Sequence, residues 1–395
     1  MMSVAVRARV VLLTSVLVLG VAGCGGAAVK PKAGTSGSVT GSPSPVQSVA
    51  MARPGVYKPS GATPDILVQS PTSLSAAVVQ GAARTKGVKV SEQFSMATFY
   101  REEEAITYAA VNPATFRQFT PGPTATLNDV WDRLADGEIA LRPDLRQQLA
   151  EADDYVTLGN DDNAQRAHIG AYAPLVDRSR IGALLNQRWA ARLHMPEGNA
   201  LLISTGKLDP APVLKSLRKS FGKQVSVTLL APNVDPSAAL AAVLTGGSIA
   251  RAVGSFTYTA NKDGTVNPEA RWVREYIRSE VVPILGNVTC NKAMLPQLRA
   301  ALGRIQRSGL ASKIHRGEYG GCYVPRFIAR DPSRGLSFHT FGTAIDLNVP
   351  GNQRGTVGLI DRRVVRIMQE CGFNWGGTWN YTDPMHFELA RLTAC

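Results

Sequence analysis

The alternation of apolar and polar residues predicts two short strands near the end of the chain. In residues 344–349 every second side chain is a large apolar one, and residues 386–389 repeat this pattern. A strand buries such side chains on one face and turns the polar ones to the other. Asp346 in the first strand, and His386 and Glu388 in the second, are therefore expected on the polar faces of their strands.

Three segments around these strands carry apolar residues at helical spacing. They are residues 271–282, 295–308 and 357–371. Gly309 and Gly372 follow the last two segments, where glycine commonly ends a helix. Helices grouped around short strands indicate an α+β fold. Pro268 marks the expected start of this C-terminal domain, which would span residues 268–395.

An earlier stretch, residues 61–267, has the length of a second, separate domain. The helix that begins near residue 127 is expected to be capped by Thr126 or Asn128. The order of strands and helices again predicts an α+β domain. No spacing of its side chains indicates catalysis, so a binding or positioning role is expected. Strands are predicted at residues 88–99, 105–111, 155–159, 200–205 and 225–230, and helices at 127–135 and 212–221.

The first 60 residues do not look like part of a folded domain. A basic start precedes an apolar run at residues 10–21, which is too short to span a membrane comfortably and is typical of a signal peptide. The small residues before Cys24 resemble a bacterial lipobox, which implies removal of residues 1–23 and lipid attachment to Cys24; an ordinary secreted protein is the alternative. Residues 24–60, rich in Gly, Ser and Pro, predict a flexible tether. We therefore expect a protein of the bacterial envelope, outside the cytoplasmic membrane and anchored to it by lipid.

Cysteine usage agrees with export. Besides Cys24, the chain has four cysteines, and all lie in the C-terminal domain. Exported proteins commonly pair such residues as disulfides. Short loops favour the pairs Cys290–Cys322 and Cys371–Cys395, and a zinc site made of thiolates is the alternative on number alone.

The chain is strongly basic, with a formal net charge of +13 over 395 residues. Such a charge attracts anionic partners through its long-range field. Phospholipid headgroups, wall polymers and substrate carboxylates are all possible partners outside a membrane. Nucleic acid is not expected, because the chain has an export signal and contains no nucleic-acid-binding motif.

Two stretches of the C-terminal domain contain the side chains of a catalytic metal site. His339 and Asp346 stand in the first stretch, and Asp383 and His386 in the second. A catalytic zinc site uses three N or O ligands, an open position for water and a nearby carboxylate that accepts a proton. Asp383 precedes a proline, which disfavours helix and predicts a turn into the second strand.

The pattern Ser-x-His-x6-Asp at residues 337–346, followed by Asp-Pro-Met-His-Phe-Glu at 383–388, resembles the VanY-type M15 family of zinc D-alanyl-D-alanine carboxypeptidases and endolysin peptidases. Residues 372–379, Gly-Phe-Asn-Trp-Gly-Gly-Thr-Trp, are also similar to that family. The resemblance covers roughly the last third of the chain and implies the hedgehog/DD-peptidase fold. It further implies that zinc is held by His339, Asp346 and His386.

The same resemblance implies the remaining roles in such a site. Asp383 would be the general base, and an arginine upstream of the first motif would stabilise the reacting carbonyl. Arg326 matches best, with Arg330 and Arg334 as alternatives. Ser337 would contact the substrate or support the ligands. The role of Glu388 stays open, and aromatic residues of the second stretch would either wall the cleft or pack in the core: Trp375, Trp379 and Tyr381.

Together these features predict a zinc peptidase that hydrolyses peptide bonds in peptidoglycan stem peptides, of the D-alanyl-D-alanine carboxypeptidase type. An endopeptidase of the same fold, a non-catalytic zinc-containing module that binds wall peptides, and an envelope scaffold are the alternatives. Residues 61–267 resemble the extracytoplasmic domains of MacB/FtsX-type transporter permeases at residues 109–113, 134–139 and 154–159. No membrane spans follow that region, so transport is not implied.

Overall fold

The structure is a computed structural model that describes residues 49–102, 104–159, 164–177, 179–222, 225–230, 239–245 and 247–395. The predicted signal peptide and Cys24 lie outside the described residues. All the described residues belong to one compact unit. Within the described ranges, no helix is both long and apolar enough to cross a membrane.

The described end of the predicted tether, residues 49–60, contains no helix or strand. It is nevertheless attached to the folded chain at its start. Val49 is 2% exposed, and its carbonyl accepts a hydrogen bond from the Asn186 side chain at 2.8 Å. The amide of Met51 donates to the carbonyl of Ala135 at 2.7 Å. Backbone groups of this segment are thus satisfied by the domain that follows it.

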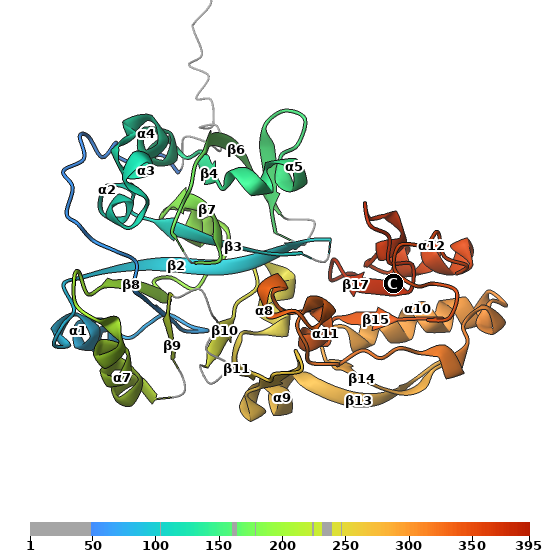
Figure 1. The fold of residues 1–395 in the computed structure, drawn as a ribbon. Coiled ribbons are helices and arrows are strands. Elements are labelled where there is room, and N and C mark those ends of the chain that lie inside the picture. The colour runs from blue at the N-terminus through green and yellow to red at the C-terminus, as the bar shows by residue number, and fades with distance from the viewer. Residues whose placement is uncertain are drawn as a thin grey trace, which may run out of the picture. The chain divides into compact units, whose positions relative to one another are not determined.

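A nine-stranded mixed sheet dominates the first half of the described chain (Figure 1). Its strand order is β5-β6-β4-β7-β3-β2-β8-β1-β9. The pairs β3–β7 and β4–β6 are parallel and the others are antiparallel. The strands are β1 Ile66–Gln69, β2 Val90–Arg101, β3 Glu104–Val111, β4 Ile139–Leu141, β5 Tyr155–Leu158, β6 Gln165–Tyr172, β7 Ile181–Asn186, β8 Ala200–Ser204 and β9 Ser226–Leu229.

Apolar side chains of several helices in this half share cores with the sheet. In α7 the inward residues are Val213 and Leu217, and they share a core with β1 and β8. The predicted cap of α4 is wrong: Leu127 is its N-cap and makes no side-chain cap bond. Asn128 is instead the first helical residue, and its side-chain oxygen accepts a hydrogen bond from Arg117. The helices are α1 Ala76–Arg84, α2 Pro113–Phe116, α3 Gly122–Thr126, α4 Asn128–Asp136, α5 Arg146–Leu149, α6 Trp189–Arg192 and α7 Pro210–Phe221.

Three small antiparallel sheets and several helices make up the second half (Figure 1). The sheets have the orders β10-β11-β12, β13-β14 and β15-β17-β16. Helices and sheets therefore occur in both halves, and the α+β prediction is confirmed. The elements are β10 Leu240–Ala242, α8 Ser248–Val253, β11 Phe256–Ala260, β12 Val266–Pro268, α9 Ala270–Tyr276, β13 Ile277–Val282, β14 Gly286–Asn291, α10 Leu295–Arg307, α11 Phe338–Phe341, β15 Ala344–Asp346, α12 Arg362–Glu370, β16 Phe373–Trp375 and β17 His386–Leu389.

The helix predicted at 271–282 is half wrong. The helix α9 ends at Tyr276, and residues Ile277–Val282 form the strand β13, paired with β14. Ile277, Val281 and Val282 are β-branched, and such residues fit strands better than helices. The third predicted helix begins later than residue 357, at Arg362, because Asp361 caps it by accepting a hydrogen bond from the amide of Arg363. The prediction for 295–308 is confirmed by α10.

One apolar core runs through the second half from Ala242 to Leu389. It contains the inward residues of α10, such as Leu298 and Leu302, which are fully buried. It also contains Phe256 and Tyr258 of β11, so this core extends across the predicted domain start at residue 268. That start stays a prediction.

Cysteine pairing is the preferred one: Cys290 bonds Cys322 and Cys371 bonds Cys395. The first disulfide links Cys290 of β14 to Cys322, which lies in the irregular segment between α10 and α11. Removing it by a Cys290→Ala/Cys322→Ala double substitution should lower the free energy of unfolding by about 3–4 kcal/mol, because the unfolded chain regains the conformational entropy that closing the loop removes. Denaturant unfolding followed by tryptophan fluorescence measures this. An unchanged unfolding transition would contradict it.

Candidate metal centre

The first polar stretch is held in place by a single helical turn. The hydroxyl of Ser337 caps α11 by accepting a hydrogen bond from the amide of His339 at 3.3 Å. Gly342 ends the turn with a φ of +66°, a conformation that glycine adopts without strain. A Cβ at Gly342 would lie 2.8 Å from the backbone nitrogen of Asn291. The chain then enters β15, which carries Asp346.

The second polar stretch meets the first through strand pairing. In the antiparallel register of β15 and β17, Asp346 lies directly opposite His386, and Ala344 opposite Glu388. Side chains directly opposite each other in an antiparallel pair have Cβ atoms about 4.5–5.5 Å apart. The register therefore brings together a carboxylate and an imidazole that are 40 residues apart in the sequence.

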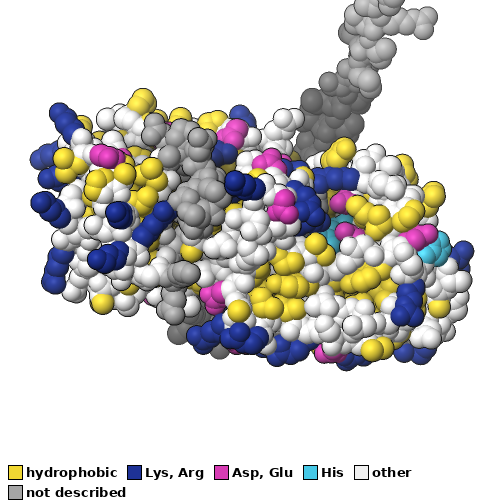
Figure 2. Space-filling view, turned by 60° about the horizontal axis from the view of Figure 1, so that its bottom comes forward, with side chains coloured by type: hydrophobic (Ala, Val, Ile, Leu, Met, Phe, Trp, Pro, Cys, Tyr) yellow, Lys and Arg dark blue, Asp and Glu magenta, His cyan; other side chains and the backbone are white. Residues whose placement is uncertain are grey.

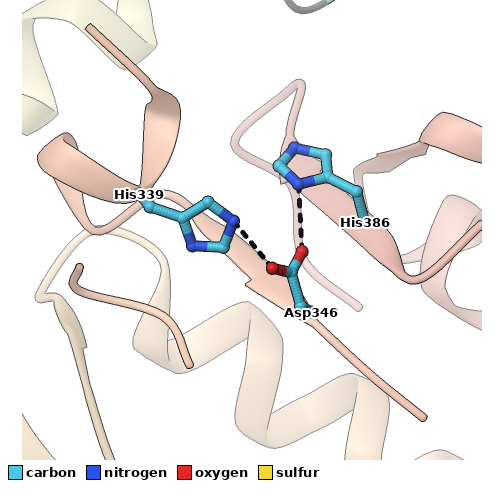
Figure 3. Close-up of side chains that lie close together, drawn as sticks. All are labelled: His339, Asp346 and His386. Carbon is cyan, nitrogen blue, oxygen red and sulfur yellow. Dashed lines mark hydrogen bonds and ion pairs between the residues drawn. The ribbon is translucent and has the colours of Figure 1, made fainter. Parts of the chain in front are cut away.

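His339 points one ring nitrogen at this pair (Figure 3). Its Nδ1 lies 3.0 Å from the carbonyl oxygen of Cys322, which can only accept, so Nδ1 carries the proton. Its Nε2 lies 3.3 Å from Oδ2 of Asp346 but makes no hydrogen bond. A buried imidazole nitrogen without a proton or a hydrogen bond is suited to bind a metal.

His386 uses its two nitrogens differently. Nδ1 lies 3.1 Å from Oδ1 of Asp346, as Figure 3 shows. Nε2 lies 3.5 Å from Oε2 of Glu388. Glu388, whose role the sequence left open, thus stands behind the ring, on the side away from Asp346. Carboxylates in this position commonly orient metal-binding histidines.

The three side chains fit a zinc ion. Their ligand atoms all lie within 4.8 Å of one another. Two ligands at 2.0–2.1 Å from a tetrahedral zinc are about 3.3 Å apart. His386 Nδ1 lies 3.1 Å from Oδ1 of Asp346, and His339 Nε2 lies 3.3 Å from Oδ2 of the same carboxylate. His339, Asp346 and His386 are 1%, 9% and 2% exposed. Buried polar groups need partners, and one cation would satisfy all three.

The charges within the group shift the pKa values of Asp346 and His386 in opposite directions. Burial alone would raise the pKa of Asp346, but the neighbouring His339 and His386 rings outweigh it and hold that pKa well below its usual range. Burial lowers the pKa of His386, but the carboxylates of Asp346 and Glu388 reverse this and raise it well above its ordinary value. The two carboxylates therefore favour the protonated form of His386.

Asp383 lies in a turn that leads into β17, as its position before proline predicts. The amide of His386 donates to the carbonyl of Asp383 at 3.0 Å, and the amide of Asp383 donates to the carbonyl of Gly376 at 2.8 Å. Asp383 is 4% exposed. The turn is further held by Trp375, whose indole donates to the carbonyl of Pro384 at 2.7 Å. These bonds hold the backbone of Asp383 in place three residues before His386, one of the three candidate metal ligands.

The predicted aromatic wall divides into core and surface. Trp375 is 6% exposed and belongs to the core. The ring of Trp379 lies 5.2 Å from that of His386. Tyr381 is 60% exposed, with the guanidinium of Arg354 over its ring at 5.2 Å. Within the described part of the chain, Trp379 is the one of these three aromatic residues whose ring contacts an imidazole of the candidate metal group.

Arg326 lies close to the first stretch through its backbone. Its amide donates to the hydroxyl of Thr340 at 2.8 Å, and that hydroxyl donates back to the carbonyl of Arg326 at 2.7 Å. Arg326 is half-buried and Arg330 is exposed. The guanidinium of Arg330 contacts the carbonyl of Asp263 at 3.5 Å. Arg334 is half-buried in a short 3-10 turn.

The sequence did not predict that the segment around Gly320 and Gly321 lies beside the candidate metal group. Residues Gly320 and Gly321 run alongside β15, and the amide of Gly320 donates to the carbonyl of Asp346 at 2.9 Å. A Cβ at Gly320 would lie 2.8 Å from the Cβ of Asp346. Burial, together with the charge of Asp346, raises the pKa of the adjacent Tyr319 to about 12. The pair of glycines was the available signal for this close approach.

Residues 330–389 match the D-alanyl-D-alanine carboxypeptidase family of M15 peptidases. An M15 peptidase domain thus lies at the C-terminal end of the chain. The match contains His339, Asp346, Asp383 and His386, and it begins after Arg326. No curated protein matches the chain significantly. The resemblance of residues 61–267 to MacB/FtsX-type domains has no support from the comparisons.

The surface around the M15 domain is not uniformly basic. On the face shown in Figure 2, Lys and Arg side chains are scattered over both ends, and histidine atoms reach the surface next to acidic ones on the right. The positive charge on this face is therefore dispersed.

Loss of either histidine should abolish tight metal binding by the M15 domain. We expect His339→Ala and His386→Ala to weaken zinc affinity by at least about 100-fold, since each removes a ligand. His315→Ala is the matched control, because His315 is exposed and pairs with Glu318. Zinc content after dialysis, measured by mass spectrometry, distinguishes the variants. Zinc retained by both ligand variants would contradict the site.

Zinc affinity should also increase with pH. The raised pKa of His386 favours a protonated imidazole, and this ring must release its proton when it binds a metal. Each such proton makes affinity tighter by up to about tenfold per pH unit. Chelator competition at several pH values measures the slope. An affinity independent of pH below neutrality would show that no ligand proton is displaced.

Proposed function

We propose that the chain is a zinc-dependent peptidase that hydrolyses peptide bonds in peptidoglycan stem peptides. The observation that carries the proposal is a buried His339, Asp346 and His386 group inside a segment that matches M15 peptidases. Asp383, buried three residues before His386, adds the carboxylate that hydrolysis requires. The intact carboxylate favours an enzyme over a binding module.

His339 Nε2, Asp346 and His386 Nδ1 would hold the zinc ion. When bound, zinc lowers the pKa of water and polarises a carbonyl, which makes hydrolysis feasible near neutral pH. Asp383 accepts the proton of the attacking water and passes it to the leaving amine. Glu388 and the carbonyl of Cys322 keep the two imidazoles oriented toward Asp346.

Arg326 stabilises the negative charge that develops on the reacting carbonyl oxygen. The backbone amide and carbonyl of Arg326 both bond the hydroxyl of Thr340, which holds Arg326 beside the stretch that carries His339. Ser337 acts by capping α11, since its hydroxyl already accepts a hydrogen bond from the amide of His339 and the residue is only 2% exposed. Trp379 and Tyr381 provide the substrate-facing aromatic surface.

The D-alanyl-D-alanine carboxypeptidase type is the favoured specificity, because the matching family carries that description. A carboxypeptidase needs a cation for the free terminal carboxylate of its substrate. Arg326, Arg330 and Arg334 lie in the segment before the first motif and are candidates for it. An endopeptidase would instead need a cleft that is open at this position, so that the substrate chain can continue past the cut bond.

The cellular setting completes the proposal. Residues 1–23 act as a lipoprotein signal peptide, and Cys24 carries the lipid that anchors the chain outside the cytoplasmic membrane. Residues 24–60 tether the folded chain to that anchor. Residues 61–267 form a binding or positioning domain, and residues 268–395 adopt the hedgehog/DD-peptidase fold.

Replacing the proposed base should separate chemistry from metal binding. Asp383→Asn keeps the size of the side chain but cannot accept a proton, so muropeptide cleavage should fall at least about 100-fold while zinc content stays unchanged. Asp331→Asn, an exposed change within the same family match, should cleave like the wild type. Mass spectrometry of digested muropeptides follows the products and identifies the bond that is cut.

Unchanged turnover in Asp383→Asn would remove Asp383 from the mechanism. Zinc binding without any cleavage by the wild type would instead favour a wall-peptide binding module.

A further inference from the structure

The end of the β2–β3 hairpin, which belongs to the nine-stranded sheet, touches the M15 domain. Tyr100 is 5% exposed, and it lies in the core cluster that surrounds the metal group. Its strand partner Ala105 packs on the same cluster. Among the described residues before Leu240, these two are the ones that contribute to that core.

Tyr100 packs against the two phenylalanines of the helical turn that carries His339. Its ring lies 4.3 Å from that of Phe338 and 6.4 Å from that of Phe341. Phe338 and Phe341 are the first and last residues of α11, and His339 lies between them in the same single turn. A four-residue helix has too few internal hydrogen bonds to be stable alone. Its geometry therefore depends on the side chains packed around it.

Ala105 fixes the approach to the same turn. A Cβ on Gly335 would lie 2.4 Å from the Cβ of Ala105, so only glycine fits there. Gly335 has a φ of +83° and stands two residues before the cap Ser337. The hairpin and the segment that leads into α11 are thus in direct contact.

A third contact reaches the other metal-binding stretch. The carboxylate of Glu102 accepts a hydrogen bond from the amide of Asn380 at 3.1 Å. Asn380 follows Trp379, whose ring lies 5.2 Å from that of His386, and precedes Asp383 in the same loop. One hairpin therefore contacts both stretches that supply the metal group.

We infer that the β2–β3 hairpin positions the zinc site, with Tyr100 and Glu102 as positioning residues. The inference rests on the proposed function, because it concerns the same zinc site. It gives the nine-stranded sheet a role in the reaction: the sheet holds α11 and the loop before β17 at the spacing at which His339 and His386 can share one ion. Neighbours that hold metal ligands in place typically change metal affinity by about 10–100-fold when removed.

Two pairs of variants in the full chain test this inference. Tyr100→Ala should weaken zinc affinity by about tenfold or more. Phe99→Ala is the matched control: Phe99 is 1% exposed on the same strand but faces a different core, with its ring 5.6 Å from that of Tyr108. It also removes a buried aromatic ring, yet it should change zinc affinity by less than about twofold, since Phe99 packs in a core that contains no residue of α11.

Glu102→Ala and Glu104→Ala form the second pair, which does not disturb a core. Glu104 stands at the end of the same hairpin but accepts its hydrogen bond from Gln148 of the sheet domain. Glu102→Ala should speed hydrogen–deuterium exchange in residues 376–386 and weaken zinc affinity several-fold, and Glu104→Ala should do neither. This pair decides the question if Tyr100→Ala does not fold.

Chelator competition gives the zinc affinities, and thermal unfolding reports stability separately. Equal zinc affinities in each variant and its control would overturn the inference while the wild type still binds zinc, so the proposed function would stand. A wild type that binds no zinc would remove both.

Discussion

The antiparallel pairing of β15 with β17 is the constraint on which the metal group depends. It places Asp346 opposite His386, and the two residues then need only His339 to complete a set of three ligands. A slip of one residue would turn every side chain of a strand to the opposite face and would separate the carboxylate from both rings. Buried Ile345 and Phe387, which face each other across the same pair, hold the register through the core.

Burying the candidate metal ligands costs free energy of solvation, which hydrogen bonds and a bound cation would offset. Burying a carboxylate and two imidazoles is unfavourable unless each finds a partner. The Cys322 carbonyl accepts a hydrogen bond from the outer nitrogen of His339, and the Glu388 carboxylate lies 3.5 Å from the outer nitrogen of His386. Glycines at 320 and 342 let neighbouring backbone approach where a Cβ would collide. The inner sides of the rings face Asp346, so that the three side chains could hold one metal ion.

Much of the site could be predicted because its chemistry is local in sequence. His339, Asp346 and His386 stand in two motifs, and the alternation of β15 and β17 indicated which side chains share a face. The preferred disulfide pairs also agree with the structure. The strand β13 was missed because residues 271–282 have apolar residues at helical spacing, while pairing with β14 decides their conformation. The contacts of Glu388, Tyr319 and Tyr100 depend on strand register and on packing between distant segments, which no local pattern encodes.

The most direct test of this account is anomalous diffraction at the zinc edge from crystals of the protein prepared with zinc. The account predicts a single strong peak about 2.0–2.2 Å from His339 Nε2, an Asp346 oxygen and His386 Nδ1, with Asp383 facing the open coordination position. A peak elsewhere, or an empty site between the three side chains at saturating zinc, would contradict it.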